Sequence, residues 1–183
     1  MKIILLIPIY NDRESLTKLI ENINFEVKDL NSKISVVVIN DASSQQIIDT
    51  YQNLENINSF EIINMKENRG HARCIASGLK YIFEKKEFDY VIPMDGDGED
   101  RPEEIKSFIQ LAEQTNDKSI VGERTKRSES LFFKICYQLH KLLTLGFTGH
   151  SIKFGNFTCL SKSTIKKMLN EKATWNSFSG SLK

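Results

Sequence analysis

Stretches of branched apolar residues recur along this chain and alternate with segments in which apolar residues return every three or four positions. The apolar stretches are "KIILLIPI" (2–9), "KISVVVIN" (33–40), "SFEIINM" (59–65), "FDYVIPM" (88–94) and "SIVGE" (119–123). Continuous runs of this kind are typical of strands that are covered on both faces, as in a mostly parallel sheet. The pattern therefore predicts five buried strands.

Helices are predicted between the strands, because leucines and isoleucines there recur at the spacing of one helix face. The two clearest segments are 13–23, with Leu16, Leu19, Ile20 and Ile23, and 72–83, with Ile75, Leu79 and Ile82. The resulting order βαβαβαβαβ predicts an α/β, doubly wound architecture. A length of 183 residues suits one domain with a substantial core, so we expect a single domain over 1–183.

The last third of the chain is less regular. Residues 128–147 predict a strongly apolar amphipathic helix, which is compatible with core packing, the default, and with a membrane interface. Residues 154–169 predict a short strand followed by a helix. The apolar run at the N-terminus is too short for a signal peptide or a membrane span.

Composition and charge exclude few classes of protein. A hydrophobic content of 40% and a charged content of 27% are those of an ordinary globular protein. The net charge is +1, yet residues 118–183 hold twelve basic and three acidic side chains. That asymmetry predicts a surface facing phosphate groups or a membrane, with solvated helix faces as the alternative. The cysteines Cys74, Cys136 and Cys159 form no CxxC motif, which favours a reducing compartment.

Polar residues follow each of the first four predicted strands. In open α/β sheets ligands bind beyond the carboxyl ends of the strands, so these residues are the first candidates for a site. Asp41 also fits a simple helix cap, since Ser43 and Ser44 follow it. The phosphate-binding patterns GxGxxG and GxxxxGK[ST] are absent from the sequence. The candidates are Tyr10–Asp12, Asp41, Asn68–His71 and Asp95–Asp100.

The acidic segment "DGDGED" (95–100) is the strongest chemical signal. Pro102 fits the first turn of a helix, with Asp100 as a possible cap and Glu103 and Glu104 favourable to the helix N-terminus. Helix formation does not explain the carboxylates of Asp95, Asp97 and Glu99. Asp95, Asp97 and Glu99 stand close together and repel one another unless a cation lies among them. Their hard oxygen ligands suit Mg²⁺ or Mn²⁺.

Three motifs compete for this segment. An EF-hand loop fails, because its sixth and twelfth positions would be Asp100 and Lys106. A phosphohydrolase of the haloacid-dehalogenase type would use Asp95 as nucleophile and Asp97 as acid, usually after the first strand. The DxD motif of nucleotide-sugar glycosyltransferases lies in mid-chain, after a nucleotide-binding half. Three predicted strands precede the segment here, which favours the third motif.

Five segments together resemble a known family: "IPIYNDRESL", "VVVINDASSQ", "ENRGHARCIASGL", "DGDGEDRPEEI" and "VGERTKR". Over residues 3–168 the chain resembles the inverting glycosyltransferases of the GT-A fold, in the dolichol-phosphate-mannose-synthase-like, polyprenyl-phosphate branch of glycosyltransferase family 2. The resemblance implies a Rossmann-like fold with a mostly parallel central sheet and helices on both faces. It also implies a nucleotide-binding half, 1–94, and a metal and acceptor half, 95–183. Relatives usually continue further, so a C-terminal truncation is expected.

The resemblance assigns roles to individual residues. Asp41 would bond the base, Cys74 stands where a small Ala is usual, and Glu123 replaces the Ser of the family's GSR segment. Arg124 would face the phosphates and act in catalysis with Asp97. The implied nucleotide-sugar contacts are Pro8, Tyr10, Asn11, Asp12, Asp41, Asn68, Gly70 and Asp95, with Gly78 in the same glycine motif. The implied metal ligands are Asp95, Asp97 and Glu99.

The implied reaction is a Mg²⁺- or Mn²⁺-dependent, inverting transfer of a sugar from a UDP- or GDP-sugar. Asn156 stands where many relatives carry an acidic general base. A polyprenyl phosphate (dolichyl or undecaprenyl) is already ionised and needs no base, so this lipid phosphate is the expected acceptor. The alternatives are the phosphohydrolase and a non-catalytic nucleotide-sugar-binding module. His71 is a candidate phosphate contact, whereas His140 and His150 are expected to be structural or surface groups.

The expected setting follows from that acceptor. We expect a cytoplasmic protein in peripheral contact with the cytoplasmic face of the membrane, acting in the synthesis of cell-envelope glycans. No nucleic-acid partner is expected.

Overall fold

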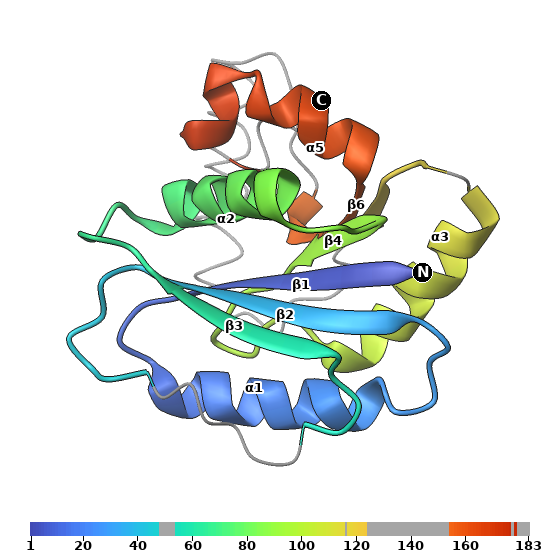
Figure 1. Cartoon of the computed structure of the whole chain (residues 1–183), viewed down its shortest axis with the longest axis horizontal. Coiled ribbons are helices and arrows are strands. Elements are labelled where there is room, and N and C mark those ends of the chain that lie inside the picture. The colour runs from blue at the N-terminus through green and yellow to red at the C-terminus, as the bar shows by residue number, and fades with distance from the viewer. Residues whose placement is uncertain (48–53, 116, 124–153, 177, 179–183) are drawn as a thin grey trace, which may run out of the picture.

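A six-stranded sheet with helices on both faces forms the protein in the computed structural model, which describes residues 1–47, 54–115, 117–123, 154–176 and 178 (Figure 1). The strand order is β3-β2-β1-β4-β6-β5. The strands are β1 (Lys2–Ile9), β2 (Lys33–Asn40), β3 (Ser59–Asn64), β4 (Tyr90–Pro93), β5 (Ile120–Glu123) and β6 (Phe154–Ser161). The helices are α1 (Arg13–Glu26), α2 (His71–Lys85), α3 (Ile105–Thr115) and α5 (Lys162–Leu169), with short 3₁₀ turns η1 (Pro102–Glu104) and η2 (Lys172–Trp175).

The predicted mostly parallel sheet is confirmed. Strands β3, β2, β1 and β4 pair in parallel, while β6 runs antiparallel to both β4 and β5. All five predicted strands are present, and the first two have the predicted bounds. The predicted strand and helix over 154–169 correspond to β6 and α5.

One predicted helix has no counterpart in the described part of the chain. Between β2 and β3, residues 41–47 and 54–58 form no helix. Residues 48–53 of this connection lie outside the described residues, so a helix between β2 and β3 stays a prediction. The described loop after β2 is held by hydrogen bonds to the neighbouring strand ends.

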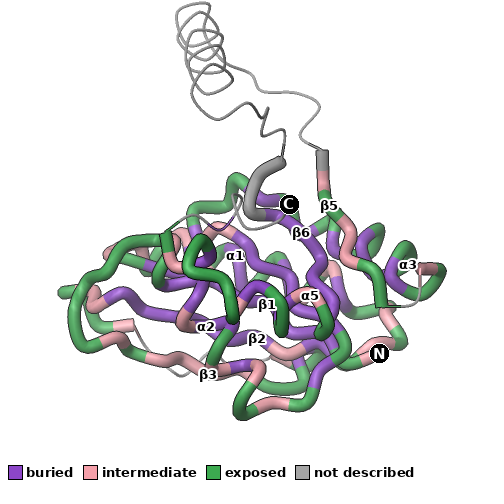
Figure 2. The backbone as a smooth tube through the Cα atoms, turned by 90° about the horizontal axis from the view of Figure 1, so that it is seen from above, coloured by how far each residue is buried: buried purple, intermediate pink, exposed green. Residues whose placement is uncertain are grey.

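The core lies in two layers, one on each face of the sheet. Alternate residues of β1 enter different layers: Ile3, Leu5 and Ile7 pack with α1 and α3, whereas Ile4 and Leu6 pack with α2 and α5. Figure 2 shows the central strands as buried along most of their length. This double burial explains why the strand sequences are continuously apolar.

Two described cysteines are buried in these layers and are not disulfide-bonded. Cys74 and Cys159 are each 0% exposed, and burial raises the pKa of each thiol to about 12. We expect neither to react with iodoacetamide in the native protein between pH 7 and pH 9, because the thiolate is the reactive form. Mass spectrometry of a Cys136→Ser variant would show labelling only after denaturation. Rapid native labelling would contradict the burial.

The predicted helix over 128–147 and most of the basic C-terminal third lie outside the described residues, so both stay predictions. Among the helices that are described, none is long and apolar enough to cross a bilayer.

Candidate functional site

The candidate residues gather where parallel strands β1, β2 and β4 end. Ile9 pairs with Asn40 at the ends of β1 and β2, so the loops after these strands start side by side. The backbone N–H of Met94, just after β4, donates to the Leu6 carbonyl at 3.0 Å. The acidic loop, residues 95–100, therefore begins beside β1.

The acidic loop packs tightly on the end of β1. Gly96 is buried, and a Cβ atom added there would lie 2.8 Å from the backbone oxygen of Pro8. Gly98 has φ +82°, a conformation that favours glycine. The two glycines of the sequence signal thus have different structural reasons: the first allows close approach, and the second allows the turn.

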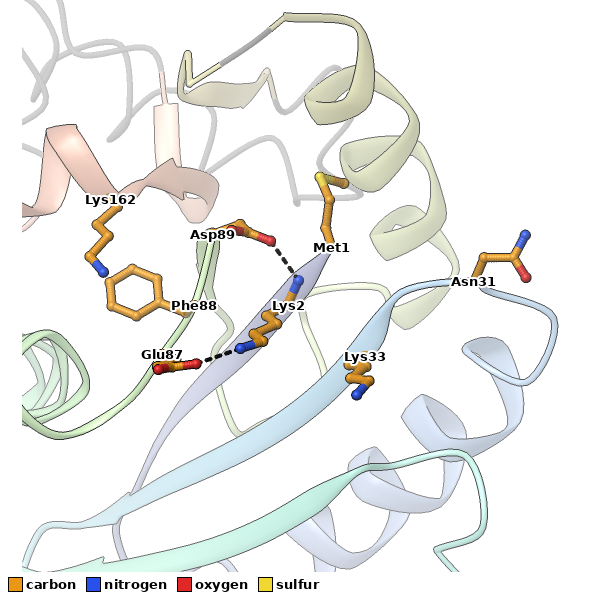
Figure 3. Close-up of a pocket in the computed structure, with 8 residues that line it drawn as sticks. All are labelled: Met1, Lys2, Asn31, Lys33, Glu87, Phe88, Asp89 and Lys162. Atoms are coloured by element: carbon orange, nitrogen blue, oxygen red, sulfur yellow. Dashed lines mark hydrogen bonds and ion pairs between the residues drawn. The ribbon is translucent and has the colours of Figure 1, made fainter.

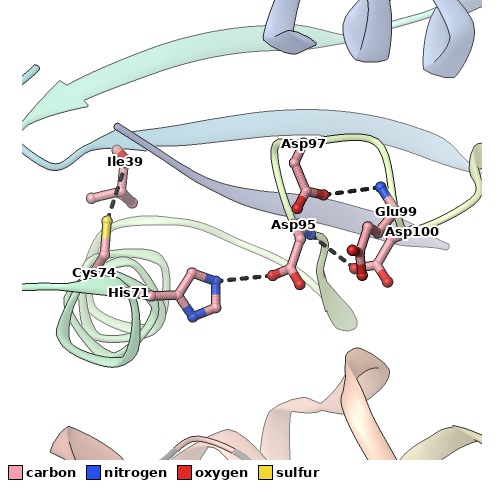
Figure 4. A network of polar contacts seen from close by, with 7 residues as sticks. All are labelled: Ile39, His71, Cys74, Asp95, Asp97, Glu99 and Asp100. Atoms are coloured by element: carbon pink, nitrogen blue, oxygen red, sulfur yellow. Dashed lines mark hydrogen bonds and ion pairs between the residues drawn. The ribbon is translucent and has the colours of Figure 1, made fainter. Parts of the chain in front are cut away.

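The carboxylates of the acidic loop lie in different environments (Figure 4). Asp97 and Glu99 are exposed, and the Asp97 Oδ1 atom accepts the Glu99 backbone N–H at 2.9 Å. Asp100 is 3% exposed and accepts the Asp95 backbone N–H at 2.8 Å. The expectation that Asp100 caps the next helix was wrong, because Arg101 occupies the N-cap position of η1. Pro102 begins η1 as predicted.

His71 joins this loop from the first turn of α2. Its Nε2 atom lies 2.9 Å from Asp95 Oδ1, and the Asp95 side chain is 23% exposed. The hydrogen bond with Asp95, together with the negative charges of Asp97 and Asp100, raises the pKa of the His71 imidazole. His71 therefore places a protonatable group against the loop.

A complete metal-ligand group is not assembled within the described residues: no three His, Cys, Asp or Glu side chains converge as a cation site would require. Asp95 contacts His71, while Asp97 and Glu99 lie further along the loop. The predicted set of Asp95, Asp97 and Glu99 stays a prediction. Its chemistry still fits Mg²⁺ or Mn²⁺, which take remaining ligands from water and substrate phosphates.

Asp41 is a buried carboxylate that fixes the start of α2. It is 4% exposed, and its two oxygens accept the backbone N–H groups of Arg69 and Gly70, each at 2.8 Å. Gly70 is the N-cap of α2 with φ +84°. Asp41 therefore positions the loop that carries His71, and it caps no helix of its own.

The Asn11 side chain holds the loop after β2 by hydrogen bonds. Its Oδ1 atom accepts the Ser44 N–H at 2.8 Å, the Ser44 hydroxyl at 3.1 Å and the Gln45 N–H at 3.3 Å. Its own N–H donates to the Ser43 hydroxyl, and its φ is +51°. The neighbouring Asp12 caps α1 by accepting the Ser15 N–H.

Asn40 extends this network to a third strand end. Its side-chain N–H donates to Asn64 Oδ1 at 2.8 Å, and its own Oδ1 accepts the Ser43 N–H at 3.0 Å. The sequence analysis missed Asn40. The signal that could have found it was an amide side chain ending an otherwise apolar strand.

We expect Asn11→Ala to destabilise the fold by about 1–2 kcal/mol, because donors from the β2 loop lose their acceptor. Asn11→Asp should lose much less, since a carboxylate accepts the same bonds and tolerates a positive φ. Urea unfolding would measure both. Equal stability of the Ala and Asp variants would contradict a stabilising role for the hydrogen bonds to Asn11 Oδ1.

Of the remaining implied nucleotide contacts, Pro8 and Tyr10 line a pocket, whereas Asn68 is not among the residues that line it. Pro8 is buried, and the exposed Tyr10 stands beside it at a pocket of about 350 Å³. Asn68 is exposed in the loop before Gly70. The pocket is lined by Pro8, Ile9, Tyr10, Asp12, His71, Asp95, Gly96 and Asp97. The pocket therefore brings together the ends of β1 and β4 and the start of α2.

Two further predictions, for Arg124 and Asn156, are not tested by the structure. Arg124 lies outside the described residues, so its proposed place near phosphates stays a prediction. Asn156 belongs to strand β6. The expected absence of a general base at this position also stays a prediction.

A larger pocket, of about 490 Å³, lies at the opposite, amino ends of the strands (Figure 3). Its acidic residues already contact Lys2: Glu87 pairs with the ammonium group at 2.5 Å, and Asp89 accepts the backbone N–H at 2.7 Å. Lys162 lies over the Phe88 ring at 5.2 Å. We place the candidate site at the smaller pocket, because the acidic loop lies there.

Known proteins resemble the chain in sequence and fold. Residues 4–174 match the family model "Glycosyl transferase family 2". The undecaprenyl-phosphate 4-deoxy-4-formamido-L-arabinose transferase of Proteus mirabilis is 28% identical over 163 residues, which cover 88% of this chain and 48% of that protein. The chain spans about half the length of the curated relatives that it matches.

Two solved structures show the same kind of fold. Residues 1–349 of S. aureus TarS in complex with UDP-GlcNAc align with a TM-score of 0.60 and 18% identity, over 91% of this chain and 47% of that one. The mannosyltransferase PcManGT of Pyrobaculum calidifontis in complex with GDP-Man and Mn²⁺ aligns with a TM-score of 0.57 and 14% identity, over 91% and 46%.

Proposed function

Because the chain belongs to glycosyl transferase family 2, we propose that it transfers a sugar from a nucleotide diphosphate sugar to a polyprenyl phosphate. The predicted GT-A fold is confirmed by the alignment with solved glycosyltransferases. The observation that carries the proposal is the acidic loop after β4, which lines a pocket together with the end of β1 and the start of α2. Undecaprenyl phosphate in the relatives' names supports the choice of acceptor.

Asp95 and Asp97 would hold a divalent cation, Mg²⁺ or Mn²⁺, with Glu99 nearby. Such a cation neutralises the charge that develops on a diphosphate leaving group. The hard carboxylate oxygens support this assignment. The exposure of Asp97 and Glu99 also supports it, because it leaves room for substrate phosphates, which complete the coordination in sites of this kind. The complex of PcManGT with GDP-Man and Mn²⁺ offers a precedent within the same fold.

The chain's own groups would bind and orient the donor. Tyr10 and Pro8 would line the nucleotide side of the pocket, and His71, when protonated, would place a positive charge beside the acidic loop. Asp41 would hold the loop at residues 69 and 70 while its remaining acceptor capacity bonds the base. Arg124 would contribute a guanidinium to the phosphates.

The acceptor would attack the anomeric carbon from the face opposite the diphosphate, and the single displacement would invert its configuration. A lipid phosphate is ionised near pH 7, so Asn156 at the family's acidic position does not prevent the reaction. We also propose peripheral contact with the cytoplasmic face of the membrane, where such an acceptor resides. Vesicle co-sedimentation without any preference for anionic lipid would contradict that contact.

The test is calorimetric titration of the chain with UDP-glucose and GDP-mannose, with and without Mn²⁺, followed by transfer to undecaprenyl phosphate in detergent. Metal-dependent binding of one donor and formation of a lipid-linked sugar would support the proposal. Donor binding without transfer would identify the non-catalytic module instead. Phosphate release from simple esters with no nucleotide requirement would favour the phosphohydrolase.

A further inference from the structure

Asp100 differs from the carboxylates around it. Residues 97–99 are exposed, whereas Asp100 is 3% exposed. A carboxylate taken out of water loses hydration and must recover that free energy through hydrogen bonds. Asp100 accepts the backbone N–H of Asp95 at 2.8 Å. Its burial is therefore tied to the residue that begins the acidic loop.

This hydrogen bond closes the acidic loop at its base. It joins the first and last residues of the loop, while the Asp97 to Glu99 bond shapes the turn between them. On the other side, Gly96 lies against the Pro8 backbone and His71 contacts the Asp95 side chain. The backbone of Asp95 is thus fixed by Asp100, and its side chain by His71 (Figure 4).

We infer that Asp100 is a positioning residue, whose carboxylate holds the Asp95 backbone so that Asp95 and Asp97 present their oxygens to the cation. The inference rests on the proposed function, which supplies the reason for a cation at the acidic loop. The sequence predicts Asp100 as a possible helix cap. The structure instead shows its carboxylate accepting the Asp95 N–H at the base of the acidic loop. A misplacement of about 1 Å in such a site reduces activity by roughly 100-fold, so the closure of the loop matters for function.

Charge and geometry can be separated at this position. Asp100→Asn loses the charge but keeps an oxygen that accepts the Asp95 N–H. Asp100→Glu keeps the charge but moves the acceptor by one methylene group in a buried place. Positioning predicts tighter Mn²⁺ binding by the Asn variant than by the Glu variant, whereas a purely electrostatic role predicts the reverse order. Asp100→Ala should bind Mn²⁺ at least about tenfold more weakly than the wild type.

The experiment follows two quantities in each variant: amide hydrogen exchange of Asp95 by NMR, and the Mn²⁺ dissociation constant from the EPR signal of free Mn²⁺, without nucleotide. We expect Asp95 protection in the wild type and the Asn variant, and its loss in the Ala variant. Glu104→Ala, which removes a neighbouring exposed acidic side chain, is the matched control and should change neither quantity. If the Ala variant does not fold, the Mn²⁺ affinities of the Asn and Glu variants, compared with each other, still test the inference.

Two results would overturn the inference: Glu binding Mn²⁺ more tightly than Asn, or Asp95 exchange that is the same in all folded variants. Failure of the proposed function is distinguishable from these outcomes. It would appear as absence of nucleotide-sugar binding by the wild type while the amide and Mn²⁺ measurements still rank the variants.

Discussion

The Asp97→Asn variant is expected to transfer sugar at least about 100-fold more slowly than the wild type with saturating Mn²⁺. Asparagine keeps the oxygen that accepts the Glu99 N–H at 2.9 Å, so the turn of the loop is preserved. The substitution removes the negative charge that would bind the cation. The expected loss is therefore chemical, and the melting temperature should stay close to that of the wild type.

Steady-state transfer rates over a Mn²⁺ titration would measure this effect. The matched control is Glu113→Gln, which neutralises an exposed carboxylate on α3 and should leave the rate unchanged. A variant at Asp97 that kept the wild-type rate and Mn²⁺ dependence would show that the cation, if used, binds elsewhere.

The Gly78→Val variant is expected to lose about 3 kcal/mol of unfolding free energy. A Cβ atom added at Gly78 would lie 2.4 Å from Leu6 Cδ1 and 2.9 Å from Ile39 Cγ1. Both partners are buried in the sheet, at 0% and 1% exposure. Either the buried side chains of Leu6 and Ile39 repack or helix α2 shifts away from β1 and β2, and the melting temperature should fall by roughly 10 °C.

Lys80→Val is the control for the effect of a β-branched residue in the same helix. Lys80 is exposed and pairs with Glu84 at 3.9 Å, so its replacement should cost less than about 1 kcal/mol. Chemical denaturation would compare the two variants. Equal losses would mean that α2 does not approach the sheet as closely at Gly78 as the structure places it.

The secondary structure was largely predictable, because buried strands and amphipathic helices leave local patterns. The bounds of β1 and β2 followed from their apolar runs, and the stripe of Leu16, Leu19 and Ile20 identified α1. The position of β6 between β4 and β5 was not predictable. Local periodicity shows that a strand exists but carries no information on which neighbours it pairs with.

The composition of the site was also more predictable than its contacts. Two aspartates with glycines after a strand indicated the acidic loop. The bond from Asp41 to the start of α2 spans 28 residues, and that from His71 to Asp95 spans 24. Such contacts are decided by the packing of whole elements. The resemblance implies that Asn11 and Asp12 contact the nucleotide, which stays a prediction, and the structure adds that their side-chain oxygens accept hydrogen bonds from the backbone N–H groups of Ser44 and Ser15.

The antiparallel strand β6 affects the order in which the chain can fold during synthesis. Strands β1 to β4 are complete once residue 93 has been made, and they form one continuous parallel unit. The next strand to emerge, β5, has to wait for β6, which separates it from β4. Until residues 154–161 leave the ribosome, the edge of β4 stays open to pairing with other chains. Nascent chains stalled before this point should therefore depend most on chaperones.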